Sequence, residues 1–228
     1  MATPIPEGFT RMEAPSDGTT RIVVLSCNWA PYKLTWPAWA EHYRRHWHMP
    51  WGAATFAYGC AWPVSAFFCE DRAQAWGDFV AASLAAVTEP VVLLFMDDMV
   101  LTADVDLPEL LRCRKEMDAE HASYYRVVPT PECTRPFAHG KGGVHDPRDG
   151  MYAGSLYPSF WSREYLIAQA RGCQDPWSFE TSRPIAPAGI HLAVTRENRP
   201  LSITELLKRG AWTEDGQKIM AAGGWPTA

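Results

Sequence analysis

The chain has 228 residues, of which 47% are hydrophobic and 21% are charged, and its formal net charge is −5. This composition is typical of a soluble globular enzyme with a substantial core. The negative charge gives no overall basic surface for nonspecific nucleic-acid binding, and no apolar run approaches the length of a membrane span.

The six cysteines are scattered along the chain and form no Cys-x-x-Cys pair. Since the sequence also shows no signal peptide, we expect reduced thiols in a cytoplasmic protein.

Strands and helices are expected to alternate through the first half of the chain. The predicted strands cover 21–27, 55–58, 91–96 and 123–128, and the predicted helices begin at Thr35, at Asp71 (ending near 87) and at Asp106. On the first of these helices, aromatic residues at helical spacing form a stripe that we assign to the core: Trp36, Trp39, Tyr43 and Trp47.

The second half begins with a change in composition. Residues 129–150 are rich in Pro, Gly, His and charged residues, and so long a loop predicts a functional lid or a disordered segment. The expected elements that follow are a strand at 152–157, a helix at 161–170 stopped by Gly172, a segment opening at 175 and a strand at 190–194. Together the pattern predicts an α/β fold, with residues 1–228 as one domain.

The acidic pair Asp97 and Asp98 directly follows the uninterrupted apolar run 91–96. A strand buried on both faces has this pattern, and open α/β sheets bind ligands at the carboxyl ends of such strands. Two neighbouring carboxylates that lose water need compensation, which a divalent cation bridging to phosphate oxygens provides. The alternative is an acidic turn in which Asp98 caps the next element.

Five segments occur in an order that resembles small GT-A-fold glycosyltransferases of bacterial polysaccharide loci and of large viruses and phages. They are Ile-Val-Val-Leu-Ser-Cys at 22–27, Phe-Met-Asp-Asp-Met-Val-Leu at 95–101, Tyr-Arg-Val-Val-Pro at 125–129, Ser-Leu-Tyr-Pro-Ser-Phe-Trp at 155–161 and Asp-Pro-Trp-Ser-Phe-Glu at 175–180. The matching features are the opening strand, an acidic pair in place of Asp-x-Asp, and the Pro-Trp-x-Phe-Glu segment, which is the most specific.

The resemblance spans about residues 20–195. It implies a single GT-A-like (Rossmann-like) domain with a mixed central sheet flanked by helices. About 20–128 would bind the nucleotide sugar and about 129–228 would bind the acceptor and carry catalysis. The chain departs from the expected pattern in its Gly/His-rich insertion and in its Ser-Leu-Tyr-Pro segment.

Such enzymes move a sugar from a nucleoside-diphosphate sugar to a hydroxyl acceptor, and a Mn²⁺ or Mg²⁺ ion stabilises the leaving diphosphate. By resemblance, Asp98 is the expected direct metal ligand and Asp97 the contact to a ribose hydroxyl or the metal's outer shell. His191 would complete the coordination, its alternative being a hydrogen-bonded histidine inside a strand.

Inverting transfer needs a base that removes the proton of the acceptor hydroxyl. Glu180 is the first candidate, because it follows the metal motif in the expected order and because Trp177 and Phe179 offer apolar surfaces that raise a carboxyl pKa. Asp175 is the second candidate. The alternative for Glu180 is an acid in the first turn of a helix, favoured by the helix dipole.

The nucleotide is expected to bind the loop that leaves the first strand. Its backbone groups and aromatic rings come from Ser26, Cys27, Asn28, Trp29 and Tyr32. Arg126 or Lys141 would neutralise the diphosphate, although a lone arginine in a strand is often part of a surface ion pair.

A glycan is the expected acceptor, and the runner-up is a hydroxylated or hydroxymethylated base in phage DNA. Other readings of the acidic pair are a metal-dependent hydrolase and a non-catalytic carbohydrate- or nucleotide-binding domain. A sugar nucleotidyltransferase is disfavoured, because the first strand is not followed by a glycine-rich loop. A zinc site at His42, His46 and His48 is also disfavoured, since no Cys or carboxylate completes a ligand set.

Overall fold

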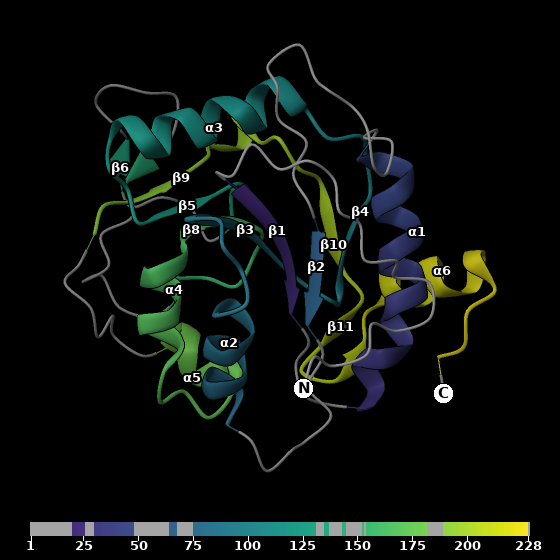
Figure 1. Cartoon of the computed structure of the whole chain (residues 1–228). Coiled ribbons are helices and arrows are strands. Elements are labelled where there is room, and N and C mark those ends of the chain that lie inside the picture. The colour runs from purple at the N-terminus through teal and green to yellow at the C-terminus, as the bar shows by residue number, and fades with distance from the viewer. Residues whose placement is uncertain are drawn as a thin grey trace.

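A computed structural model describes residues 20–25, 30–47, 64–67, 75–130, 135–136, 143–144, 152, 154–181 and 189–227. A mixed sheet forms its centre, with strands in the order β2-β1-β3-β8-β5-β9-β7-β6 (Figure 1). The strands are β1 (Thr20–Leu25), β2 (Val64–Phe67), β3 (Val91–Met96), β5 (Tyr124–Arg126), β6 (Arg135–Pro136), β7 (Gly143–Val144), β8 (Ser159–Ser162) and β9 (His191–Ala193). The expected α/β class with a mixed central sheet flanked by helices is confirmed.

The directions of the strands show which edge of the sheet is expected to bind ligands. Strands β1, β2, β3, β5 and β9 run the same way, because β1 pairs parallel with β2 and β3, and β5 pairs parallel with β9. Strand β8 lies antiparallel between β3 and β5. The carboxyl ends of the five parallel strands therefore share one edge of the sheet, where α/β folds bind their ligands.

Both faces of the sheet are covered by helices. These are α1 (Trp36–His46), α2 (Trp76–Leu84), α3 (Leu107–Ala119), α4 (Arg163–Ala170), α5 (Pro176–Thr181) and α6 (Glu214–Gly223), with 3-10 turns η1 (Ala30–Thr35) and η2 (Arg196–Asn198). Helices α2, α4 and α5 group on one side of the sheet, and α1 and α6 lie together elsewhere (Figure 1). Among the described residues, no helix has the length and apolar character needed to cross a membrane.

The uninterrupted apolar run of β3 reflects burial on both faces, as predicted. Alternate residues of this strand enter different cores: Leu93 and Phe95 pack with residues of α1 and α3, while Val92 and Leu94 pack with residues of α2 and α4. Trp39, Tyr43 and Trp47 of the predicted aromatic stripe belong to the first core, whereas Trp36 is only partly buried. Trp39 stacks on Tyr43 with ring centres 4.9 Å apart and meets Phe95 edge-on at 6.0 Å.

Two small sheets complete the carboxyl edge. Strand β4 (Met99–Leu101) pairs antiparallel with β10 (Ile203–Glu205), and β11 (Leu207–Lys208) forms a hairpin with β12 (Ala211–Trp212). These pairs bring residues from 203 onward next to the turn at 97–98, a proximity that no local sequence pattern indicates.

Several predicted boundaries were wrong. Thr35 precedes α1 as expected, but its hydroxyl donates to the carbonyls of Tyr32 and Asp97 instead of capping the helix. Helix α2 follows Ala75, while Asp71 lies outside the described residues, as does the strand expected at 55–58.

In the second half, the strand expected at 152–157 is absent from the described part of that segment, where Tyr152 has a φ of 67°. The strand in this region is β8 instead. It includes the first residues of the helix expected at 161–170, and that helix therefore begins at Arg163. The segment 129–150 contributes β6 and β7 to the sheet edge, and its other residues beyond 130 lie outside the described residues.

Candidate active site

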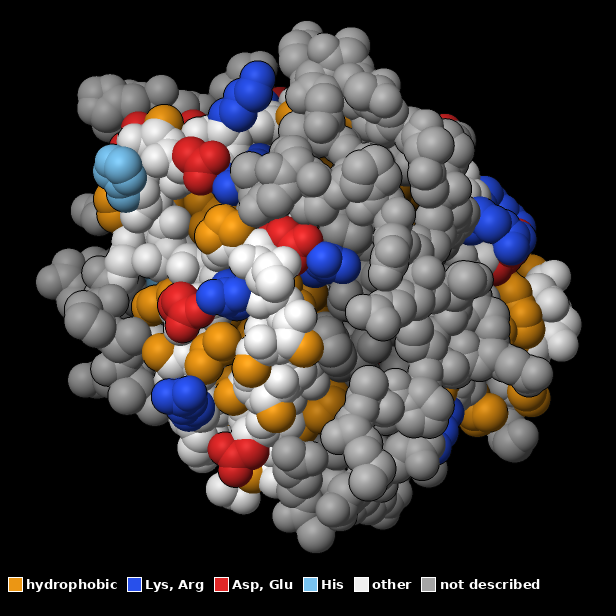
Figure 2. Space-filling view, viewed as in Figure 1, with side chains coloured by type: hydrophobic (Ala, Val, Ile, Leu, Met, Phe, Trp, Pro, Cys, Tyr) orange, Lys and Arg blue, Asp and Glu red, His pale blue; other side chains and the backbone are white. Residues whose placement is uncertain are grey.

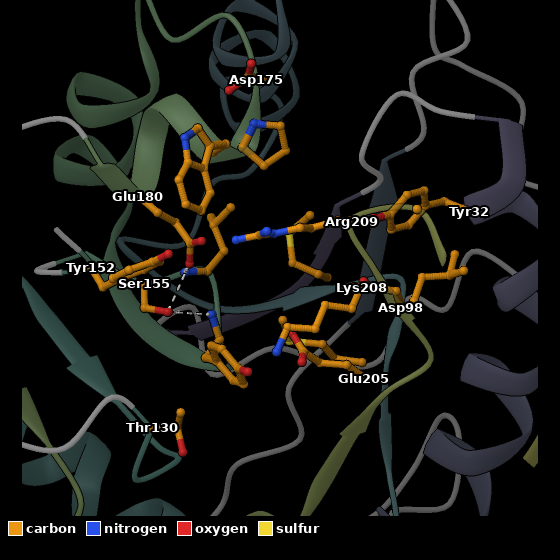
Figure 3. Close-up of a pocket in the computed structure, with 18 residues that line it drawn as sticks. Tyr32, Asp98, Thr130, Tyr152, Ser155, Asp175, Glu180, Glu205, Lys208 and Arg209 are labelled. Carbon is orange, nitrogen blue, oxygen red and sulfur yellow. Dashed lines mark hydrogen bonds between the residues drawn. The ribbon is translucent and has the colours of Figure 1, made fainter. Parts of the chain in front are cut away.

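A cavity of about 600 Å³ opens at the carboxyl end of β3 (Figure 3). Its lining comes from both halves of the chain. The lining residues that are charged at neutral pH by type are four acids and two bases: Asp98, Asp175, Glu180, Glu205, Lys208 and Arg209. Aromatic rings from Tyr32, Tyr152, Tyr157 and Trp177 complete much of the wall. The cavity thus combines carboxylates, cations and aromatic surfaces, which suits a polar ligand with an anionic part.

The turn between β3 and β4 places Asp98 in this cavity. The backbone carbonyl of Asp98 accepts a hydrogen bond of 2.7 Å from the amide of Leu206, which fixes the turn against the segment following β10. The Asp98 side chain is buried, and burial raises its pKa well above the usual range, as do the nearby charges of Asp97 and Glu205. A cation at this position would reverse that shift by favouring the carboxylate.

Asp97 is held by contacts to the elements that flank the turn. Its carboxylate accepts a 2.9 Å hydrogen bond from the indole of Trp36, and its amide donates to the carbonyl of Leu25 over 3.0 Å. The side chain is buried and lies outside the lining of the cavity. Asp97 thus links β1, α1 and the turn, and its expected contact to a ribose hydroxyl or to the metal's outer shell stays a prediction.

Glu180 lies in the cavity, on α5. Its carboxylate accepts hydrogen bonds from the amide of Leu156 (2.8 Å) and from the hydroxyl of Ser155 (3.1 Å). Burial raises the pKa of Glu180, while these two donors lower it in part by stabilising the charged form. The group is thus held in a fixed orientation with a raised pKa, which suits a general base.

Asp175 also lines the cavity, but its carboxylate is engaged elsewhere. It accepts a hydrogen bond of 2.6 Å from the amide of Ser178, in the manner of a helix cap at the start of α5. The side chain is exposed and lies apart from Glu180 in Figure 3. Of the two candidate bases, the geometry favours Glu180.

The hairpin β11–β12 brings two cations into the cavity. Lys208 ends β11, and Arg209 and Gly210 form the two-residue turn with φ values of 52° and 79°. Positive φ at both turn residues matches the twist of antiparallel strands. In Figure 3, Lys208 and Arg209 extend across the cavity toward the side that carries Glu180. These cations are suited to neutralise an anionic ligand group.

Glu205 and Tyr157 lie where two cavities meet. The carboxylate of Glu205 lies near the hydroxyl of Tyr157, and burial together with this carboxylate raises the pKa of Tyr157. Both residues also line a second cavity of about 400 Å³, together with Thr130 and Arg199 among others. Glu205 lies on β10 opposite Met99 of β4, and it is therefore a second carboxylate close to Asp98.

His191 lies away from this site, which corrects its assignment as a metal ligand. It pairs with Tyr124 across β9 and β5, at the level of Val92 near the start of β3, whereas Asp98 follows the end of β3. Its Nε2 is hydrogen-bonded to the hydroxyl of Tyr165 over 2.9 Å in a buried environment. The alternative reading, a hydrogen-bonded histidine in a strand, agrees with the structure.

Of the residues expected to contact the nucleotide, only some fall within the part of the chain that the structure describes. Tyr32 is buried against the cavity, on the opposite side from Glu180 in Figure 3. Ser26, Cys27, Asn28, Trp29 and Lys141 lie outside the described residues. Arg126 is fully buried, donates from its Nε to the carbonyl of Val128 over 3.1 Å and lies outside the lining of the cavity. Its assignment to the diphosphate is therefore corrected.

Several residues that line the cavity were not predicted from the sequence: Tyr152, Ser155, Tyr157, Glu205, Lys208 and Arg209. Only the hairpin left a local signal, because Arg209-Gly210 separates two short segments that each contain a large apolar residue. Among the described residues, no three His, Cys, Asp or Glu side chains gather into a ready-made metal site.

No protein-family model and no curated protein matches the chain. Two crystal structures of S. aureus TarS are similar to it at 10% sequence identity. The complex with UDP aligns over 79% of this chain and 62% of that one with a TM-score of 0.40, and the complex with UDP-GlcNAc over 90% and 65% with a TM-score of 0.39. The chain thus spans less than two thirds of the TarS chains, and a likeness this distant does not decide an activity.

Proposed function

We propose that this protein is a glycosyltransferase that moves a sugar from a nucleoside-diphosphate sugar to a hydroxyl acceptor, within a GT-A-like domain. One observation carries the proposal. Asp98 and Glu180, which come from distant parts of the chain, line the same cavity at the carboxyl edge of a mixed α/β sheet. One side of the cavity offers groups for a nucleoside diphosphate, and the other offers a base.

The donor half of the reaction is assigned to the side that carries Tyr32 and Asp98. The ring of Tyr32 supplies a surface for the nucleobase. Lys208 and Arg209 neutralise the diphosphate, whose negative charge grows as the bond to the sugar breaks. Both cations line the cavity, whereas Arg126 does not and Lys141 lies outside the described residues.

Asp98 and Glu205 fit a divalent cation as part of its ligand set. Both are carboxylates in the same cavity, and the proximity of Glu205 contributes to the raised pKa of Asp98. Mg²⁺ is commonly held by one or two carboxylates with the remaining ligands from phosphates and water, so the missing third protein ligand does not oppose binding. When bound, Mn²⁺ or Mg²⁺ stabilises negative charge on the leaving diphosphate.

Glu180 acts as the base in this proposal. Its carboxylate takes the proton of the acceptor hydroxyl while the hydroxyl oxygen bonds to the anomeric carbon and the bond from that carbon to the diphosphate breaks. The side of the cavity that carries Glu180 faces the side that carries Tyr32 in Figure 3. Attack from the face opposite the leaving group inverts the configuration of the sugar.

We propose a glycan as the acceptor. On the face seen in Figure 2, acidic and basic side chains of the described residues are interspersed and do not form one broad basic surface. Together with the net charge of −5, this disfavours a DNA acceptor, whose phosphates require many Lys and Arg contacts.

The donor class is tested by thermal stabilisation with a panel of nucleoside diphosphates and their sugars, with and without Mn²⁺. We expect one nucleotide to raise the Tm of the wild type in a metal-dependent way, and Asp98→Asn to lose the metal-dependent part. The control variant Glu197→Gln, on η2 and outside the cavity, keeps the full shift. Absence of a shift with every nucleotide would contradict the proposal and favour a hydrolase or another binding function.

A further inference from the structure

The indole of Trp177 is exposed and yet held in place. Half of the residue's surface, 50%, is accessible, and Trp177 is one of two large hydrophobic residues that stand out as exposed among those described, the other being Ile190 at 43%. Tyr152 meets the indole edge-on, with ring centres 6.1 Å apart and ring planes at 78°. The guanidinium of Arg209 lies 5.8 Å from the ring centre. Exposing so large an apolar surface is unfavourable, so a ring fixed in this way is suited to binding.

Trp177 lies beside the proposed base for a simple reason of helix geometry. Trp177 and Glu180 are three residues apart on α5, so they share one face of the helix, and both line the cavity. Phe179 points the other way, into the core, where it meets Trp76 and Trp161 edge-on. Packing of Phe179 thus fixes the helix and directs both Trp177 and Glu180 to the ligand.

The Trp177 side of the cavity lies away from Tyr32, the proposed surface for the nucleobase, and Arg209 lies between the two sides in Figure 3. Glu180 and Tyr152 lie across the cavity from Tyr32 in Figure 3. Tyr152 is tied to α5 through its amide, which donates a hydrogen bond of 2.7 Å to the carbonyl of Glu180. Tyr152, Trp177 and Glu180 therefore form one connected unit, which we call the aromatic wall.

We infer that the aromatic wall is the binding site for the acceptor sugar. A pyranose ring stacks its apolar C–H face on the indole of Trp177, and one of its hydroxyls then reaches the carboxylate of Glu180. The ligand class is a neutral hexopyranoside, because the wall presents aromatic rings and its one charged group, the carboxylate of Glu180, already accepts hydrogen bonds from Ser155 and Leu156. Delivery of the hydroxyl to a base rests on the proposed function, whereas binding of the sugar does not.

The test measures binding of methyl glycosides of glucose, galactose, mannose and N-acetylglucosamine by saturation-transfer NMR and titration, without any donor. We expect at least one glycoside to bind the wild type, Trp177→Ala to weaken its affinity about tenfold or more, and Trp177→Phe to retain most of it. Ile190→Ala is the matched control, because it removes a similarly exposed hydrophobic residue outside the cavity and should leave the affinity unchanged.

The inference is overturned if no glycoside binds, or if Trp177→Ala binds the glycoside as tightly as the wild type does. Nucleotide-induced stabilisation of the same variants separates this outcome from a failure of the proposed function. A wild type that binds glycosides through Trp177 but no nucleotide keeps the sugar site and rejects the transferase. If the wild type binds nucleotide and its glycoside affinity does not change on Trp177→Ala, the transferase proposal stands and the sugar site is rejected.

Discussion

Ser155 and Glu180 are joined by a hydrogen bond of 3.1 Å across 25 positions of sequence. The hydroxyl of Ser155 donates to the carboxylate, and the same hydroxyl oxygen accepts from the amide of Tyr157 over 3.2 Å. These two hydrogen bonds connect the proposed base to the segment that leads into β8. The bond from Ser155 also stabilises the ionised form of Glu180 in a partly buried position.

The first prediction concerns the pH dependence of activity. Burial raises the pKa of Glu180, and the base must be ionised to act, so kcat/KM should rise with pH through a value above the ordinary glutamate pKa of about 4.3. Ser155→Ala removes a donor that lowers this pKa. We therefore expect the acidic limb of the kcat/KM profile of Ser155→Ala to lie at higher pH than that of the wild type. The pH–rate profiles of both proteins measure this shift. An unchanged limb would contradict the role of Glu180 as the titrating base.

The second prediction concerns stability at Asp98. Because burial and neighbouring acids raise the pKa of Asp98 in the folded protein, its protonated form is favoured there. The associated stability is complete below the unfolded pKa of about 4 and is lost as pH rises toward the folded pKa.

Asp98→Asn removes this pH-dependent penalty. We expect the variant to have a higher Tm than the wild type at pH 7 in the absence of metal, by about 2–4 °C for each kcal/mol gained. The difference should shrink as pH falls toward 4, which thermal unfolding across a pH series measures. Equal Tm values at pH 7 would show that the carboxylate is not destabilised by its surroundings.

The third prediction concerns the hairpin cations. Lys208→Ala and Arg209→Ala should each weaken binding of a nucleoside diphosphate by about fivefold or more, since each removes a cation that lines the cavity and is proposed to contact phosphate. Binding of the corresponding nucleoside, which lacks phosphates, should change little. Lys218→Ala is the control, because Lys218 pairs with Glu214 on the exposed face of α6. Equal losses for nucleoside and diphosphate would contradict a phosphate contact.

The fourth prediction concerns the packing of α2 on α4. A Cβ added at Gly77 would lie 1.8 Å from the carbonyl oxygen of Ala170 and 2.9 Å from that of Cys173. Both obstacles are backbone atoms, so Gly77→Ala should destabilise the protein by about 1–3 kcal/mol or more. Urea unfolding measures this loss. Ala82→Ser, on the exposed face of the same helix, should stay within about 0.5 kcal/mol of the wild type.

The sequence predicted those parts of the fold that local patterns determine. The apolar runs of β1 and β3 alternate between two cores, so their composition alone identified buried strands. Asp106 caps α3 by accepting from the amide of Glu109, and Gly172 follows the end of α4 with a positive φ, both as expected. In each case the signal and the structure lie within a few residues of each other.

The remaining parts depend on contacts between distant segments. His191 shares the residue type and chain order of a late metal ligand, yet the register of β9 on β5 places it at the start of the parallel strands. Glu205 and Arg209 reach the cavity only because β10 pairs with β4 and a tight hairpin follows. Strand pairing of this kind is set by tertiary packing, which a single sequence does not display.

The central claim is that Glu180 is the base of a sugar transfer from a nucleotide donor. Glu180→Gln tests it most directly, because a glutamine oxygen can still accept the hydrogen bonds from Ser155 and Leu156 but cannot take up a proton. The measurement is release of nucleoside diphosphate from a panel of nucleotide sugars with methyl glycosides present, beside nucleotide-induced thermal stabilisation. We predict unchanged stabilisation and turnover lowered by about a hundredfold or more. Turnover by the variant at the wild-type rate, or no turnover of any nucleotide sugar by the wild type, would contradict the account.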